Sequence, residues 1–132
     1  MCIFCKIANG EIPCNKVYED ENAVAFLDLN PTANGHTLVV PKAHFQSVLE
    51  CDDKTNASMT KAVQIVSKAL LKTYATGINV LSNINEEAGQ VVMHAHVHVI
   101  PVNANGNKAD IKFNEIDKID LVEVKENIIK NI

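Results

Sequence analysis

The chain has 132 residues, the length of a single domain with one hydrophobic core. Hydrophobic residues make up 47% and charged residues 21%, which is typical of a soluble globular protein. The net charge is −4 and all twelve basic residues are lysine, which argues against a surface that binds nucleic acid. No apolar run approaches the length of a membrane span, and the N-terminus lacks the features of a signal peptide. We therefore expect a cytoplasmic protein with no membrane partner.

A short helix is predicted over residues 2–9, because its apolar residues fall on one side and Gly10 ends the pattern. This segment carries Cys2 and Cys5, a C-x-x-C pair. In a cytoplasmic protein such a pair is either half of a tetrahedral zinc site or two reduced thiols. The spacing alone leaves both readings open.

Two strands, residues 16–19 and 23–28, are predicted to form a hairpin around a polar turn. Asp28 ends the second strand. Its carboxylate either caps a turn or accepts a hydrogen bond from a ligand hydroxyl.

A third strand is predicted over residues 36–41, after the turn signal Asn34-Gly35. His36 lies at one end of this strand and His44 just beyond the other end. The two imidazoles therefore cannot serve the same atom. Each one, taken singly, is more typical of an ordinary polar residue than of a ligand.

A long amphipathic helix is predicted over residues 55–74, with N-cap acceptors at Asp52-Asp53 and an apolar stripe that covers one face of the sheet. A fourth strand follows at residues 78–83. The next loop ends in Gly89-Gln90, whose backbone N–H groups and amide are suited to contact an anion.

The segment 91–101 carries three histidines, His94, His96 and His98, at alternate positions among Val, Ile and Ala. We interpret it as a strand, in which residues two apart point to the same face. An imidazole titrates near neutral pH and serves as nucleophile, acid, base or metal ligand. The outer two histidines would be about 13 Å apart along an extended strand. One ion therefore does not easily bind all three, and the middle histidine is the one presented to a substrate.

The remainder is a polar segment, residues 103–108, and a small helix predicted over residues 116–132. We see no internal repeat. We expect one domain over residues 1–102 and a C-terminal extension, residues 103–132, that packs on the same domain.

Taken in order, these segments resemble the histidine triad family. The signature is His-x-His-x-His followed by two apolar residues, here residues 94–100, preceded by Gly89-Gln90. Residues 2–7, 11–13, 17–20, 25–28 and 35–44 also fit the family pattern in order. The chain is most similar to the histidine triad nucleotide-binding proteins with an N-terminal cysteine pair, and the similarity covers residues 2–101.

The resemblance implies an α+β fold: a five-stranded antiparallel sheet with a short N-terminal helix and one long helix, to which this chain adds a C-terminal tail helix. It also implies a homodimer. The implied activity is that of a purine nucleotide phosphoramidase, a hydrolase that acts at the α-phosphate through a nucleotidyl-histidine intermediate. Its partners would be purine nucleotides such as AMP or GMP.

Site residues follow from the same resemblance, position by position. His96 matches the nucleophile, His98 the residue that orients the site and touches the phosphate, and His36 a third histidine near the leaving group. Asp28 would accept the ribose hydroxyls, and Asn83, Gly89 and Gln90 match contacts to phosphate or leaving group. The apolar slot for the base would be formed by Phe4, Ile7, Ile12, Phe26, Leu29 and Leu38.

Family members with the cysteine pair bind structural zinc, and the matching ligands here are Cys2, Cys5, His44 and His94. If His94 holds zinc, catalysis rests on His96 and His98. Many relatives have a Ser at the position of Val91, and that Ser contacts the phosphate. This chain therefore lacks one hydrogen-bond donor.

Three other functions remain open at this point. The protein could be a dinucleoside polyphosphate hydrolase of the same family, with the same nucleophile and another leaving group. It could be a nucleotide-binding or scaffold module with incidental turnover. A metal-dependent hydrolase that uses the histidine row is the third reading.

Overall fold

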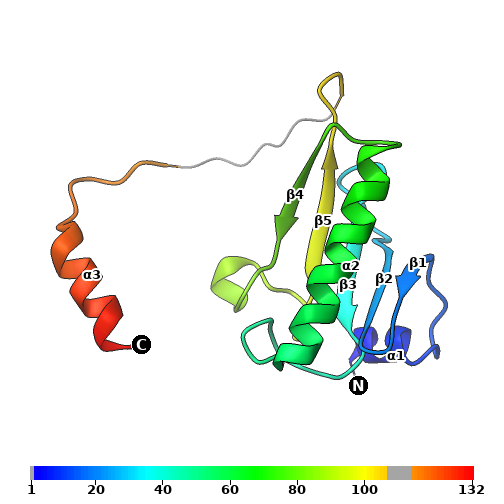
Figure 1. Ribbon diagram of the computed structural model, residues 1–132, viewed down its shortest axis with the longest axis horizontal. Coiled ribbons are helices and arrows are strands. Elements are labelled where there is room, and N and C mark those ends of the chain that lie inside the picture. Colours follow the sequence, from blue (N-terminus) through cyan, green and yellow to red (C-terminus); the bar gives the residue numbers. More distant parts are fainter. Residues whose placement is uncertain (1, 107–113) are drawn as a thin grey trace.

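The computed structural model describes residues 2–106 and 114–132. Five antiparallel strands form one sheet in the order β1-β2-β3-β5-β4, and α2 lies across one face of it (Figure 1). In chain order the elements are α1 (Ile3–Ala8), β1 (Lys16–Glu19), β2 (Ala23–Leu27), β3 (Thr37–Pro41), α2 (Asp53–Leu71), β4 (Gly77–Leu81), the 3-10 turn η1 (Glu86–Ala88), β5 (Val97–Val102) and α3 (Leu121–Lys130). The predicted α+β fold, with its N-terminal, long and tail helices, is confirmed.

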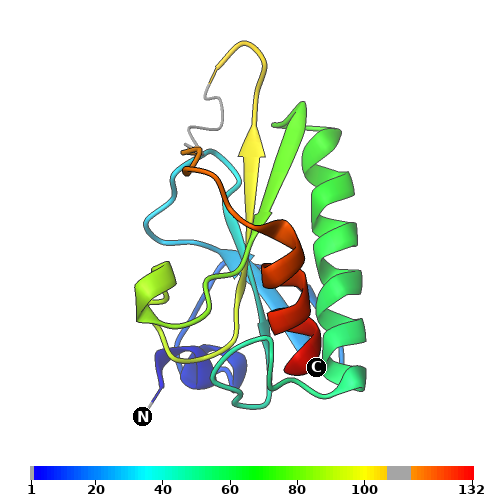
Figure 2. The same cartoon turned by 90° about the vertical axis from the view of Figure 1, so that its left-hand side faces the viewer.

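The central strands β2 and β3 are buried almost throughout, because both faces of the sheet are covered. On one face the apolar side of α2, including Met59, Ala62 and Val66, packs against alternate residues of the strands. On the other face Phe4 and Ile7 of α1 pack against the residues that point the opposite way. Figure 2 shows α2 on one side of the sheet and the loops of the second face on the other. Since α1 is short, it leaves part of the second face free for a pocket.

The helix α2 begins where the sequence predicts a cap. The Asp52 side chain accepts a hydrogen bond of 2.8 Å from the backbone N–H of Thr55, which satisfies one of the unpaired donors of the first turn. The helix ends at Leu71, a turn earlier than the apolar pattern indicates.

The histidine segment differs from the prediction of one strand over residues 91–101. Strand β5 begins only at Val97, so His94 and His96 precede it and only His98 lies within it. The backbone N–H of Ala95 donates to the carbonyl of Phe45 at 2.7 Å, which takes this stretch out of the sheet ladder. Pro101 does not end the strand either, since it pairs with Ile78 of β4.

The C-terminal extension forms α3, which stands apart from the sheet on the side of β4 (Figure 1). The helix is shorter than predicted, and among residues 114–132 no side chain is buried. Asn107 and Lys108 of the predicted polar segment lie outside the described residues, and the packing of the extension on its own domain stays a prediction. No helix in the described part of the chain is long and apolar enough to cross a membrane.

Candidate active site

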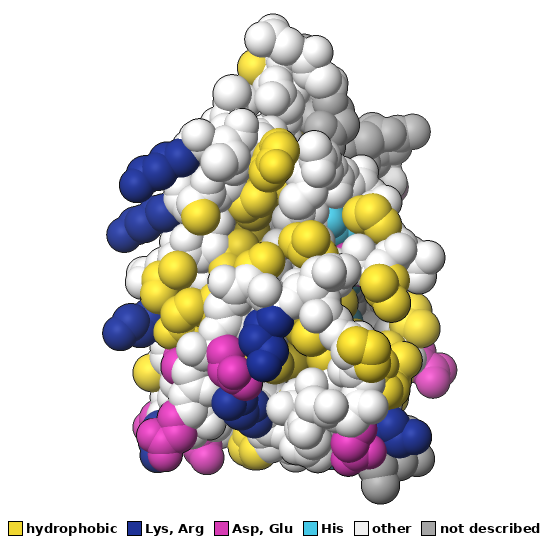
Figure 3. Space-filling model, turned by 90° about the vertical axis from the view of Figure 1, so that its right-hand side faces the viewer, with side chains coloured by type: hydrophobic (Ala, Val, Ile, Leu, Met, Phe, Trp, Pro, Cys, Tyr) yellow, Lys and Arg dark blue, Asp and Glu magenta, His cyan; other side chains and the backbone are white. Residues whose placement is uncertain are grey.

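A pocket of about 470 Å³ opens on the sheet face that carries α1. One end is apolar, and the six side chains predicted to hold a base all line it. The other end is polar, with Asp28, Gly89, His96 and His98 in its wall. In Figure 3 histidine side chains lie in a hollow surrounded by hydrophobic ones. The apolar lining includes Phe4, Ile7, Ile12, Phe26, Leu29 and Leu38, together with Ile3, Pro13, Cys14, Val91 and Val92.

His96 has a fixed tautomer. Its Nδ1 lies 2.7 Å from the carbonyl oxygen of His94. A carbonyl only accepts, so Nδ1 carries the proton and Nε2 of the neutral ring keeps its lone pair. The ring is buried edge-on between Phe4 and His98, each with its ring centroid 5.2 Å away. This is the protonation state that a nucleophilic imidazole needs.

His36 and His98 form a hydrogen-bonded pair of which only His98 is part of the pocket wall. The backbone N–H of Thr32 donates to Nδ1 of His36 at 3.2 Å, so the proton of the neutral His36 ring is on Nε2. That nitrogen lies 2.9 Å from Nδ1 of His98 and donates to it. The remaining nitrogen of His98, Nε2, therefore carries a proton. Because His98 lines the pocket and His36 does not, His98 is the member of the pair that offers a donor to a ligand.

Burial disfavours the charged form of both rings. It holds the pKa of His36 below its ordinary value, although the Asp28 carboxylate opposes this. Burial also lowers the pKa of His98, and the neighbouring His96 and His36 rings add to the effect. Both rings are therefore neutral at pH 7, as the hydrogen-bond chain requires.

Asp28 holds a turn and also lies in the pocket wall. One oxygen, Oδ1, accepts from the backbone N–H of Asn30 at 2.8 Å and so holds the turn after β2. The other oxygen, Oδ2, lies 3.5 Å from Nε2 of His36. The carboxylate is also part of the pocket wall, where it is available to a ligand hydroxyl.

Two predicted phosphate contacts are not brought into the pocket by their side chains. The Gln90 amide is buried and bonded to the backbone of Asn85, Gln46 and Val92. Asn83 donates to the carbonyl of Ala88 at 2.6 Å. Neither side chain lines the pocket. They instead hold the loop that presents Gly89, which does line it.

A second cluster lies next to the pocket and brings together the four predicted metal ligands, Cys2, Cys5, His44 and His94. Nδ1 of His94 lies 3.5 Å from Sγ of Cys2, 3.4 Å from Sγ of Cys5 and 3.1 Å from Nδ1 of His44. Zinc bonds of about 2.3 Å to sulfur and about 2.0 Å to nitrogen place tetrahedral ligands about 3.5 Å apart for S–N pairs and about 3.3 Å apart for N–N pairs. The four donor atoms therefore match a tetrahedral zinc site.

The tautomer of His94 agrees with this role. Its Nε2 lies 2.9 Å from the carbonyl oxygen of Pro41 and must donate to it, so the Nδ1 lone pair faces the two sulfurs. His94 is fully buried, and burial is the main reason that its pKa is lowered. The ring is therefore neutral and able to bind a metal.

Several residues of this site carry no signal in the sequence. Thr32 sets the tautomer of His36, and the Ser82 hydroxyl donates to the carbonyl of His96 at 2.8 Å. The carbonyl of Pro41 accepts a hydrogen bond from Nε2 of His94 and so sets the tautomer of that ring. Backbone groups and lone hydroxyls form no motif, so only Thr32, four residues before His36, offered a local clue.

Known proteins support the assignment to a family. The family model of the HIT domain matches residues 9–105. An uncharacterized HIT-like protein of Methanocaldococcus jannaschii is 46% identical over 97% of this chain and 98% of its own length. The adenosine 5'-monophosphoramidase of Schizosaccharomyces pombe is 44% identical over 76% of this chain and 73% of its own length.

Solved structures agree with these matches. The crystal structure of a HIT family member from Bacillus subtilis is 39% identical, covers 99% of this chain and 96% of its own, and gives a TM-score of 0.91. A Zn-bound histidine triad protein from Mycobacterium smegmatis is 35% identical over 89% of this chain and 84% of its own, with a TM-score of 0.75. The chain belongs to the HIT family.

Proposed function

We propose that the protein is a purine nucleotide phosphoramidase that hydrolyses the bond at the α-phosphorus through a nucleotidyl-histidine on His96. The observation that carries this proposal is the hydrogen bond from Nδ1 of His96 to the carbonyl of His94, which directs an unprotonated Nε2 at the polar end of the pocket. The name of the Schizosaccharomyces pombe relative, a monophosphoramidase, supports the choice of a P–N bond.

The pocket suits a purine nucleoside monophosphate in size and polarity. Its apolar end offers Phe4 and Phe26, whose rings meet edge to face at 5.9 Å, as walls for a flat base. The carboxylate of Asp28 is placed to accept the ribose hydroxyls. Between Asp28 and His96, the α-phosphate would lie beside the donor on His98. Few polar groups face the base, so purine preference should be loose.

The reaction would proceed in two displacements. Nε2 of His96 attacks the α-phosphorus, and the phosphorus–nitrogen bond breaks as the leaving nitrogen, which takes its proton from solvent, departs as an amine. The Nε2–H of His98 donates a hydrogen bond to the phosphate oxygens and keeps its proton. Water then attacks the phosphorus of the nucleotidyl-histidine. This water gives a proton to solvent, and the bond to His96 breaks to release the nucleoside monophosphate.

The proposal is tested by quenching turnover of adenosine phosphoramidate in acid-free denaturant and mapping the adduct by mass spectrometry. We expect adenylate on the peptide that contains His96, and no adduct in His96→Asn. Calorimetry with AMP checks that His96→Asn still folds and binds nucleotide. Full turnover by His96→Asn, or an adduct on another residue, would rule out the mechanism.

We also propose that Cys2, Cys5, His44 and His94 hold a structural zinc ion. Two thiolates and two imidazoles complete a closed tetrahedral site with no open position for substrate. When bound, the ion supplies a cross-link between chain segments and no chemistry on the nucleotide. Support comes from the donor distances above and from the Zn-bound relative of Mycobacterium smegmatis.

The chain is further proposed to form a homodimer. Strand β4 is an edge of the sheet, and its Val80 and Leu81 are exposed. The neighbouring helix α2 exposes Ile65 and Leu71. An edge strand flanked by apolar side chains is a surface that proteins usually cover.

A further inference from the structure

The helix α3 is amphipathic but has nothing to pack against in a single chain. Its apolar side chains fall on one side of the helix, and every one is exposed. A ten-residue helix is marginal in water on its own, and the stability of such helices comes from burial of the apolar face. The face comprises Leu121, Val122, Val124, Ile128, Ile129 and Ile132. It therefore needs a partner surface.

The sheet domain offers a matching groove. A cavity of about 400 Å³ lies between the first half of α2 and the strands β4 and β5, with walls that are mostly apolar. Val48, Met59, Val63, Val80 and Val97 supply most of this lining. We call this surface the α2–β4 groove. Among the described residues, nothing covers it.

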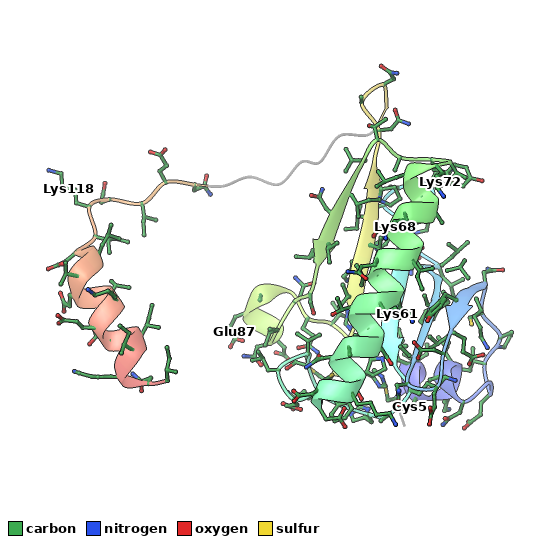
Figure 4. All side chains as sticks on the ribbon, in the orientation of Figure 1. Cys5, Lys61, Lys68, Lys72, Glu87 and Lys118 are labelled. Carbon is green, nitrogen blue, oxygen red and sulfur yellow. The ribbon has the colours of Figure 1, made fainter. Side chains whose placement is uncertain are left out.

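Charge favours a match between the two surfaces. Residues 114–132 carry five acidic and three basic side chains, a net charge of −2, whereas α2 carries Asp53 against Lys54, Lys61 and Lys68, a net charge of +2. Figure 4 shows Lys61, Lys68 and Lys72 along the outer side of α2. An acidic helix seated beside this row gains favourable electrostatic interactions.

Two observations favour a second copy over the same chain as the occupant of the groove. In the structure α3 stands away from its own sheet domain, on the β4 side (Figure 1). Residues 2–106 make up about four-fifths of the chain. Because the TM-score is averaged over the chain length, superposition of the sheet domain alone would give a score of at most about 0.8. The score of 0.91 with the Bacillus subtilis crystal structure requires residues beyond 106 to superpose as well. The outstretched helix is thus shared with a solved relative.

We propose that two copies of this chain exchange their C-terminal helices, so that the apolar face of α3 seats in the α2–β4 groove of the partner. This inference depends on the homodimer proposed above, and it names α3 as a segment that stabilises the dimer. It makes no use of the nucleotide pocket.

Sedimentation equilibrium on the full chain tests the exchange with two adjacent substitutions. Ile128→Lys places a charge on the apolar face, and Asn127→Lys places the same charge on the polar side of the same helix. We expect the dimer dissociation constant to rise about 30-fold or more for Ile128→Lys and to stay within about threefold for Asn127→Lys. Equal constants for Ile128→Lys and the wild type would overturn the exchange while leaving the phosphoramidase proposal intact. A wild-type chain that is monomeric would overturn both the homodimer and the exchange.

Cross-linking separates exchange from packing within one chain. A photoreactive phenylalanine at Leu121 is introduced into the full chain, and ¹⁵N-labelled and unlabelled chains are mixed, unfolded and refolded together. We expect cross-links to peptides that contain Met59 or Val63, with labelled and unlabelled partners in the same product. Products that join only peptides of the same isotope would place the helix on its own groove and overturn the proposal.

Discussion

Backbone carbonyls fix the tautomers of two neighbouring histidines, His94 and His96. The carbonyl of His94 makes Nδ1 of His96 a donor and frees its Nε2, and the carbonyl of Pro41 frees Nδ1 of His94. The two rings thus present lone pairs from opposite nitrogens, one toward the pocket and the other toward two thiols. Residue type alone does not distinguish them, because both are buried imidazoles two positions apart.

Protonation of His98 should set the acid side of the activity profile. A lowered pKa means that the ring stays neutral as the pH falls below the ordinary histidine value of about 6.5. We expect the acid limb of kcat/KM for a phosphoramidate substrate to lie below that value. Asp28→Asn should move the limb further down, because the carboxylate is the charge that raises the pKa of His36 and His98. A limb above pH 6.5, or a shift upward in Asp28→Asn, would contradict this assignment.

The sequence singled out the candidate reactive residues, but not the groups that orient them. Imidazoles, thiols and a carboxylate are rare enough to be noticed, and their order matched a family pattern. Their orientation depends on Thr32, Ser82 and the backbone of Pro41, which have no spacing rule. Gln90 is the opposite case. The family pattern predicts its amide at the phosphate, but in the structure this amide is hydrogen-bonded to the backbone of Asn85 and Gln46.

At the scale of elements, β2 and β3 were predictable because each is a continuous apolar run, which suits a strand buried on both faces. The helix α2 was predictable because its apolar residues recur at helical spacing on one buried face. The backbone of residues 91–96 was not predictable in this way. Its histidines alternate as in a strand, yet the backbone leaves the sheet at Ala95. Alternating histidines therefore indicate that the side chains point to the same side of the chain. They do not show that the backbone is paired with a neighbouring strand.

The turn before β3 depends on Gly35, which leads directly into His36. Its φ is +97°, and an added Cβ would lie 2.7 Å from Cδ2 of Leu70 and 3.3 Å from the Pro101 side chain. We expect Gly35→Ala to lower the free energy of unfolding by about 1–3 kcal/mol, through strain and overlap together. Urea denaturation measures this.

Two glycines serve as controls for that substitution. Gly10 has a φ of +77° with no atom within 4 Å of an added Cβ, so Gly10→Ala reports strain alone. Gly77 has open space and no such φ, and Gly77→Ala should change stability by less than about 0.5 kcal/mol. A loss for Gly35→Ala no greater than that for Gly77→Ala would show that the turn relaxes freely.

For the whole molecule, the cysteine–histidine cluster joins three segments that are far apart in the chain. Cys2 and Cys5 come from the N-terminal helix region, His44 from the loop after β3 and His94 from the stretch before β5. The Phe4 ring touches both His94 and His96, with centroids 5.9 and 5.2 Å away. Sequence spacing could not bring positions 92 residues apart together, and only the family resemblance did so.

This geometry couples the cysteine–histidine cluster to His96, the proposed nucleophile, because the His94 ring belongs to the cluster and the His94 carbonyl lies at Nδ1 of His96. We expect Cys2→Ser with Cys5→Ser to lose about one equivalent of zinc, to unfold at a lower temperature, and to lower kcat about 10-fold or more as the carbonyl that orients His96 becomes free to move. Cys14→Ser, a thiol outside the cluster, should keep the metal and the unfolding temperature. Metal content, calorimetry and turnover are measured on the same preparations. A double variant that keeps its zinc would disprove the ligand set. A zinc-free protein with unchanged kcat would show that the cluster is not needed to hold the carbonyl of His94, and that the hydrogen bond from the His94 ring to Pro41 is enough.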